Sequence, residues 1–128
     1  MADLTTEEID DIADPFFAAI TKGDVDAVAK IYASGAQIWH NFDNKDQSTA
    51  ENAVILLDMH RRAENLRYTE IRRFASPGGF VQQHVLVGNA KGGPLHMPAI
   101  IRFWVTDRRI TRLEEYLDPR QARVMYQR

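Results

Sequence analysis

The sequence predicts an α+β domain that contains an antiparallel sheet, and three observations carry this prediction. Apolar residues recur at helical spacing in three segments between residues 5 and 65. Four segments after residue 66 alternate between two faces, as the side chains of strands do. The resulting order, helices and one strand followed by a run of strands, favours α+β architecture with antiparallel pairing.

The first helix is expected between Thr5 and Gly23. Thr5 followed by Glu8 matches a capping box, which satisfies free backbone N–H groups at a helix start, and glycine is suited to a helix end. Pro15 cannot donate the interior hydrogen bond, so we expect it to kink or split this helix. Asp24 can cap a second, shorter helix that directly follows.

A strand and a third helix are expected next. Ala36–Phe42 has the alternation of a short strand, and the polar segment Asp43–Gln47 is expected to be a loop. Ser48 and Glu51 repeat the capping-box pattern. The helix that they open is expected to last to Asn65.

Four strands are expected in the remaining chain: Arg67–Phe74, Phe80–Gly88, Leu95–Thr106 and Ile110–Leu117. Both faces of the last three are largely apolar, which predicts a sheet that is covered on each side. His84 and Arg102 would then be polar groups in apolar walls, and burying such groups costs free energy unless they are hydrogen-bonded. Asp118 followed by Pro119 predicts a short terminal helix, with the aspartate as its N-cap.

Composition narrows the function classes. At 128 residues, the chain fits a single domain spanning residues 1–128. A net charge of -2 gives no reason to expect nucleic acid as a partner, and the absence of cysteine excludes disulfides and thiolate metal sites. No apolar run approaches the roughly 20 residues needed to span a bilayer, and the acidic N-terminus lacks a signal-peptide pattern. We therefore expect no membrane partner and a cytoplasmic location.

Three segments of the chain match patterns of a known family: Phe17–Val28 with its Gly-Asp break, Ile38–Asn41, and Arg109–Asp118. In these segments the chain resembles the SnoaL-like branch of the nuclear-transport-factor-two-like (NTF2-like) superfamily. The resemblance implies a cone-shaped, curved, mixed or antiparallel sheet wrapped around N-terminal helices, the cystatin-like α+β roll. It also implies a deep apolar cavity and a homodimer formed through the outer face of the sheet.

Members of this family include ketosteroid isomerase, limonene epoxide hydrolase, scytalone dehydratase, polyketide cyclases and non-catalytic proteins, so function has to be argued from the site. In the comparison with ketosteroid isomerase, the position of that enzyme's aspartate base falls at or beside His40. The positions of its two oxyanion donors fall near Phe16 and Ile101. Neither of these positions can donate the required hydrogen bond. The resemblance therefore speaks against a Δ5-steroid isomerase of that type.

More of the functional residues of limonene epoxide hydrolase have a similar residue in this chain. Trp39-His40-Asn41 is similar to the tyrosine-x-asparagine of that enzyme, and Asp118 to its closing aspartate. Gln82-Gln83-His84 takes the place of its arginine-x-aspartate, and the arginine is missing. Dehydratase-like and cyclase-like members use a cavity histidine with an aspartate, which His84 and Asp118 match.

The catalytic candidates are therefore His84, Asp118 and Asn41. In this scheme His84 moves a proton near neutral pH, Asp118 orients it, and Asn41 fixes an oxygen or a water. The plainer interpretations are a core histidine, a helix cap and a strand-end turn residue. Expected substrate-binding residues are Trp39, His40, His60, Phe16, Trp104, Tyr116 and Gln82.

The functional hypothesis is an enzyme without a cofactor that performs general acid/base chemistry on a hydrophobic small molecule, as an isomerase, lyase or hydrolase. The histidines show no metal-ligand spacing, so no metal is expected. The alternative is a protein of the same fold that binds a small molecule or serves as a dimeric scaffold. A third class, an assembly adaptor, would need an exposed apolar patch instead of an occupied pocket.

Overall fold

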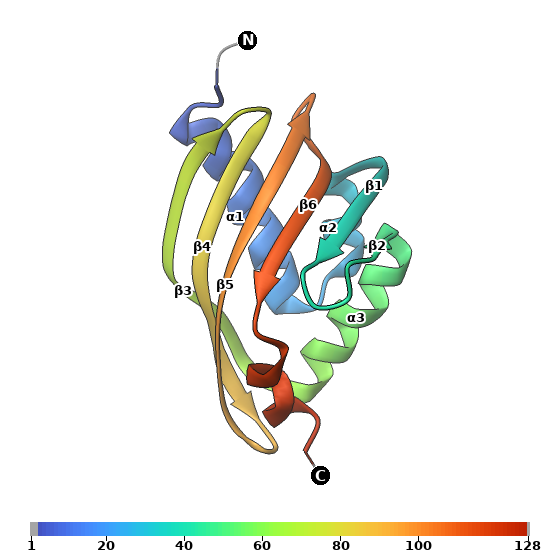
Figure 1. Cartoon of the computed structure of the whole chain (residues 1–128), viewed down its shortest axis with the longest axis vertical. Helices are drawn as coiled ribbons and strands as arrows, with labels where there is room; N and C mark the ends of the chain where they lie inside the picture. Colours follow the sequence, from blue (N-terminus) through green and yellow to red (C-terminus); the bar gives the residue numbers. More distant parts are fainter. Residues whose placement is uncertain (1–2, 128) are drawn as a thin grey trace.

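A six-stranded sheet with its α-helices behind it makes up this computed structural model, which describes residues 3–127 (Figure 1). The elements are α1 (Thr6–Lys22), α2 (Val25–Ile31), β1 (Tyr32–His40), β2 (Asp46–Gln47), α3 (Thr49–Arg62), β3 (Ala63–Ser76), β4 (Gly79–Ala90), β5 (Gly93–Thr106), β6 (Arg109–Leu117) and the 3-10 helix η1 (Pro119–Met125). The expected α+β class is confirmed.

The sheet is mixed, because its strand order β2-β1-β6-β5-β4-β3 brings the first long strand beside the last. β1 and β6 run parallel, whereas the other neighbouring pairs are antiparallel. A parallel pair requires a long crossover connection. Here α3 and the β3–β5 meander supply it. The sheet is antiparallel at every pairing except this one, which agrees with the mixed or antiparallel sheet that the family resemblance implies.

Local signals set the ends of α1. Thr5 and Glu8 form the expected capping box, and Gly23 ends the helix in the left-handed conformation at φ 71°. The expectation that Pro15 splits the helix is wrong. Pro15 lies on the exposed side of an unbroken helix, where the carbonyl that loses its N–H partner can be solvated.

Several element boundaries differ from the expected ones, and the segment Asp43–Gln47, expected to be a loop, contains the two-residue strand β2. β1 begins at Tyr32 and ends at His40, which leaves Asn41 in the turn that follows. α3 ends at Arg62, because Ala63 is already extended at φ -137° and ψ 140°. The chain therefore passes directly from α3 into β3, which begins at Ala63 and not at the expected Arg67.

The main core joins α1 to the sheet through aromatic rings. The Phe16 and Phe17 rings meet the Phe103 ring edge-on, at centroid distances of 5.6 and 6.0 Å. Phe80 stacks on Phe103 at 4.4 Å, and both of these rings are fully buried. Such pairs add about 0.5–1.5 kcal/mol beyond their buried area, which fixes α1 against β4 and β5.

No element formed by residues 3–127 covers the outer face of the sheet. This face carries Phe74 and Tyr116, which are both half-exposed, and the Arg102 guanidinium lies 4.4 Å from the centroid of the Trp104 ring. The expectation of a sheet covered on each side is therefore wrong for the single chain. Homodimer formation through this face stays a prediction.

Candidate functional site

A cavity of about 430 Å³ lies between the helices and the inner face of the sheet. Its lining is mostly apolar and comes from α1, α3, η1 and every long strand. A cavity of this size suits a small organic molecule. The polar residues in the lining are Tyr32, His40, Asp43, Gln47, Asn52, Tyr68, His84, Glu115 and Tyr126.

The mouth of the cavity is marked by lining residues that are also half-exposed. Phe42 follows β1, Ile55 belongs to α3, and Tyr126 follows η1. The Arg62 guanidinium lies 4.6 Å from the centroid of the Tyr126 ring, and Arg62 also donates to the carbonyl of Met125. Arg62 therefore ties the C-terminal segment to α3 beside the opening.

His40 and Glu115 form an ion-pair-like contact inside the cavity. They are register partners on the parallel strands β1 and β6, and His40 Nε2 lies 3.1 Å from Glu115 Oε1. Their side chains are only 11% and 18% exposed. Because a carboxylate accepts only, the imidazole must donate Nε2–H to it. His40 Nδ1 is buried and has no hydrogen-bond partner among the described residues.

His84 lies deeper in the same lining. Its Nδ1 is 2.8 Å from the Gln82 amide nitrogen, and the rings of Phe17 and Tyr68 pack on it with centroids at 5.4 and 4.7 Å. Burial lowers the pKa of His84, the nearby Glu115 opposes this, and Arg73 acts in the same direction as burial. His84 is therefore neutral at neutral pH.

Two tyrosines complete the polar lining. Burial raises the pKa of both Tyr32 and Tyr68 far above the ordinary phenol value, and the charge of Glu115 adds to this effect. Both phenols consequently stay protonated throughout the physiological pH range. The charge of Glu115 therefore acts on two neutral phenols in the lining of the same cavity.

A comparison with protein-family models identifies the family of the chain. The model of the SnoaL-like domain matches residues 13–113. The chain belongs to the SnoaL-like domain family. The resemblance seen in Phe17–Val28, Ile38–Asn41 and Arg109–Asp118 is thereby confirmed, since the match includes all or part of each segment. No curated protein matched the chain in a sequence search.

Solved structures with a similar fold include other SnoaL-like and NTF2-like proteins. A candidate isomerase from Bacillus subtilis has a TM-score of 0.79 at 16% identity, covering 94% of this chain and 93% of its own. A candidate polyketide cyclase from Xanthomonas campestris has a TM-score of 0.76 at 20% identity, covering 92% and 97%. An NTF2-like protein from Burkholderia xenovorans has a TM-score of 0.73 at 21% identity, covering 94% and 98%. At these identities the likeness shows the fold alone.

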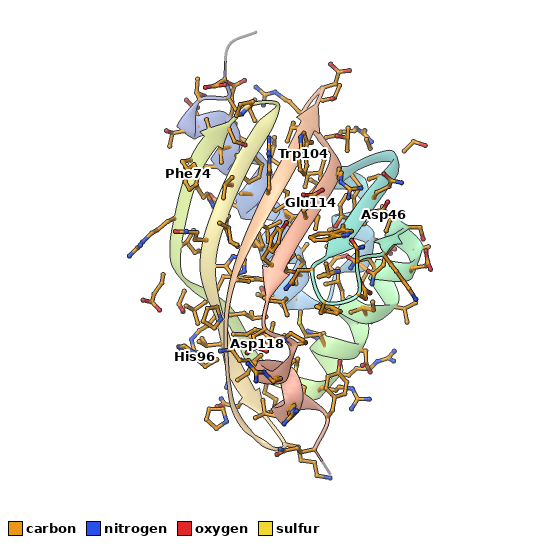
Figure 2. The ribbon with its side chains drawn as sticks, in the orientation of Figure 1. Asp46, Phe74, His96, Trp104, Glu114 and Asp118 are labelled. Carbon is orange, nitrogen blue, oxygen red and sulfur yellow. The ribbon has the colours of Figure 1, made fainter. Side chains whose placement is uncertain are left out.

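In this SnoaL-like chain, Asp118 is not among the residues that line the cavity. Its carboxylate accepts from the Arg120 backbone N–H at 3.0 Å and pairs with the Arg120 guanidinium, also at 3.0 Å. These bonds lower the pKa of Asp118. Figure 2 shows Asp118 beside η1, where it acts as the helix cap. The expectation that His84 and Asp118 converge in the cavity is therefore wrong.

Of the candidates in and directly after β1, His40 lines the cavity, whereas the expectation that Trp39 and Asn41 do so is wrong. Ile38 and His40 face the cavity, whereas Trp39 and Asn41 do not line it. Trp39 Nε1 donates to the Asn44 side chain at 2.9 Å, and Asn41 Oδ1 accepts from the backbone N–H of Leu117 at 3.0 Å. Because side chains alternate along a strand, a face that includes His40 excludes Trp39.

The remaining sequence candidates divide into three groups. Phe16 lines the cavity, as expected, and Gln82 lies fully buried behind His84. His60 is exposed on α3. Neither Trp104 nor Tyr116 lines this cavity, and Trp104 lies at the far end of the sheet from Asp118 (Figure 2).

Sequence reasoning missed Glu115, although a signal for it exists. Glu115 alternates with Leu113 and Leu117, so a carboxylate stands on the apolar face of a strand. Such a group must have a partner when buried. The partner could not be named without the register that places His40 beside it.

Within residues 3–127, no group of three His, Cys, Asp or Glu side chains is arranged to hold a metal ion. None of the helices in this part of the chain combines the length and the apolar character needed to cross a membrane.

Proposed function

We propose that the protein is an enzyme that shifts protons on a hydrophobic small molecule held in the cavity, without a cofactor. The reaction would be an isomerisation, an elimination or the addition of water. The observation that carries this proposal is the His40–Glu115 pair, which presents a nearly buried carboxylate to an otherwise apolar chamber.

Glu115 is the proposed base. One of its carboxylate oxygens accepts the hydrogen bond of His40, which leaves the other for a proton of the substrate or of a water. His40 orients the carboxylate through this hydrogen bond. An apolar substrate that fills the chamber displaces water, and this strengthens the polar contacts within.

The similar proteins support chemistry of this class. They include a candidate isomerase and a candidate polyketide cyclase of the same fold. The apolar lining favours a terpenoid, aromatic, polyketide or steroid fragment over a charged metabolite, because a charged ligand would lose its hydration without a matching partner.

The test is the substitution Glu115→Gln, measured by turnover of a library of enones, epoxides and hydroxy-aromatic compounds. Glutamine keeps the shape of the side chain but cannot accept the proton, so we expect at least roughly a 100-fold loss of kcat/KM. Glu114→Gln is the matched control, because Glu114 is the adjacent residue and pairs with Arg112 at 2.9 Å instead of lining the cavity.

Turnover that survives Glu115→Gln, or that falls equally with Glu114→Gln, would overturn the proposed base. If the parent protein turns over no compound but the same library raises its Tm, the cavity is a binding site, and the alternative of a non-catalytic small-molecule-binding protein is adopted.

A further inference from the structure

A chain of hydrogen bonds runs from exposed carboxylates on α1 to the buried side chains of Gln82 and His84. Arg73 Nη1 donates to Asp10 at 2.9 Å and to Asp14 at 2.6 Å. Arg73 Nε lies 2.6 Å from Gln82 Oε1, and Gln82 Nε2 lies 2.8 Å from His84 Nδ1. Gln82 is 0% exposed, and it is the cross-strand partner of Arg73 on β4.

The direction of every bond in this chain follows from the guanidinium. Arginine donates and never accepts, so the Gln82 atom that faces it must be the oxygen. The amide nitrogen then faces His84, and an amide NH₂ only donates. His84 Nδ1 must therefore accept, and in the neutral ring the proton resides on Nε2.

The environment keeps His84 in this neutral form. The charged groups that act on the ring are Arg73, which opposes protonation, and Glu115, which favours it, and burial outweighs the latter. An imidazolium would also have to place a second N–H against the amide NH₂ of Gln82, donor against donor. His84 lines the cavity, and its Nε2 has no hydrogen-bond partner among residues 3–127.

We propose that His84 serves as a neutral hydrogen-bond donor, whose Nε2–H binds the carbonyl oxygen of the substrate, and that Gln82 and Arg73 are positioning residues that fix this tautomer. The occupant is accordingly a carbonyl compound, such as a ketone, an enone or an ester, with an acidic C–H bond near Glu115. The catalytic part of this inference rests on the proposed function.

The step balances without an oxidant or reductant. The proton leaves the carbon next to the carbonyl and binds to the Glu115 carboxylate. The electron pair of the C–H bond becomes the C=C bond of the enolate, and the carbonyl π pair moves to the oxygen. The hydrogen bond from His84 Nε2–H strengthens as this oxygen becomes negative, which is how a preorganised donor lowers a barrier. A neutral imidazole is a known donor to a carbonyl that is being enolised.

The tautomer is tested in the unliganded full-length protein, by long-range ¹H–¹⁵N NMR of the His84 ring at neutral pH. We expect Nδ1 of His84 to be unprotonated and Nε2 to be protonated. Gln82→Glu replaces the donor by a carboxylate that accepts, so His84 Nδ1 should become protonated. Gln83→Glu makes the same charge change at an exposed neighbour, and it should leave the spectrum unchanged.

A wild-type ring protonated at Nδ1, or one populating both tautomers equally, overturns the inference, whether or not Gln82→Glu folds.

The carbonyl preference is tested with 1-tetralone and with tetralin, which has nearly the same shape but lacks the oxygen. We expect the ketone to bind roughly tenfold tighter to the parent and to Gln83→Glu, and this preference to fall at least threefold in Gln82→Glu.

Equal affinity of the parent for the two compounds, or no binding of the ketone, overturns the carbonyl preference. Neither experiment needs turnover, so the outcome is separate from that of Glu115→Gln. A correct tautomer with an inactive protein would remove the proposed reaction but keep the donor. An active protein in which His84 has the other tautomer would keep the proposed reaction but remove His84 as the hydrogen-bond donor.

Discussion

Replacing Arg73 with methionine removes both a hydrogen bond to a buried amide and two exposed ion pairs. Comparison with Asp10→Asn separates their contributions to the free energy of unfolding. Arg73 is 13% exposed, and it holds the oxygen of Gln82, which is fully buried. Methionine keeps much of the apolar stem but leaves this oxygen without a donor. An unsatisfied buried polar group costs about 1–3 kcal/mol. The lost pairs with Asp10 and Asp14 add little, because these carboxylates are 45% and 68% exposed.

We therefore expect Arg73→Met to lower the free energy of unfolding by about 1–3 kcal/mol, measured by urea titration followed by circular dichroism. For a domain of this size the change corresponds to a fall in Tm of roughly 4–12 °C. Asp10→Asn is the control, because it leaves Arg73, Asp14 and Gln82 together, and it should change stability by less than about 0.5 kcal/mol. Equal losses in the two variants would refute the reasoning, since the exposed charges would then be the dominant contribution.

Three further outcomes are expected. Because burial and Arg73 lower the pKa of His84 against the opposing Glu115, the stability contributed by its neutral form is complete above about pH 6.5 and is lost as the pH falls, so His84→Gln should flatten the decline in urea midpoint below pH 6.5. Gly23→Ala should cost about 1–2 kcal/mol in thermal unfolding, because φ is 71° and the new Cβ would lie 2.6 Å from an imidazole carbon of α3; an unchanged Tm would contradict this. Asp118→Ala should leave kcat/KM unchanged, because the carboxylate caps η1 and does not line the cavity, and a loss comparable to that of Glu115→Gln would restore it as a catalytic candidate.

The sequence predicted best what depends on near neighbours. The capping boxes at Thr5 and Ser48 and the left-handed Gly23 are all present, because each needs only residues within a few positions. The family was also recognisable from local segments. Asp118 had two interpretations, and the local one, as a cap, is the one that the structure shows.

The site was harder to predict because it depends on register between distant strands. His40 and Glu115 are 75 positions apart, and only the parallel pairing of β1 with β6 makes them neighbours. Which face of β1 points into the cavity could not be predicted either, because that also depends on contacts with distant residues. Trp39 and Asn41 looked like the functional side of the strand, but the core contact of Ile38 sets the orientation, and this brings His40 into the cavity.

The position of β1 in the sheet has a consequence for synthesis on the ribosome. Its neighbours are the two-residue β2 and the last long strand, β6. While the chain is emerging, β1 therefore has almost no backbone partner until β6 has left the exit tunnel. Closing so long a segment is slow, because its entropy is lost before the new contacts form. The His40–Glu115 pair should thus be assembled only late in folding, and a nascent chain stopped before residue 109 should have helices but an incomplete cavity.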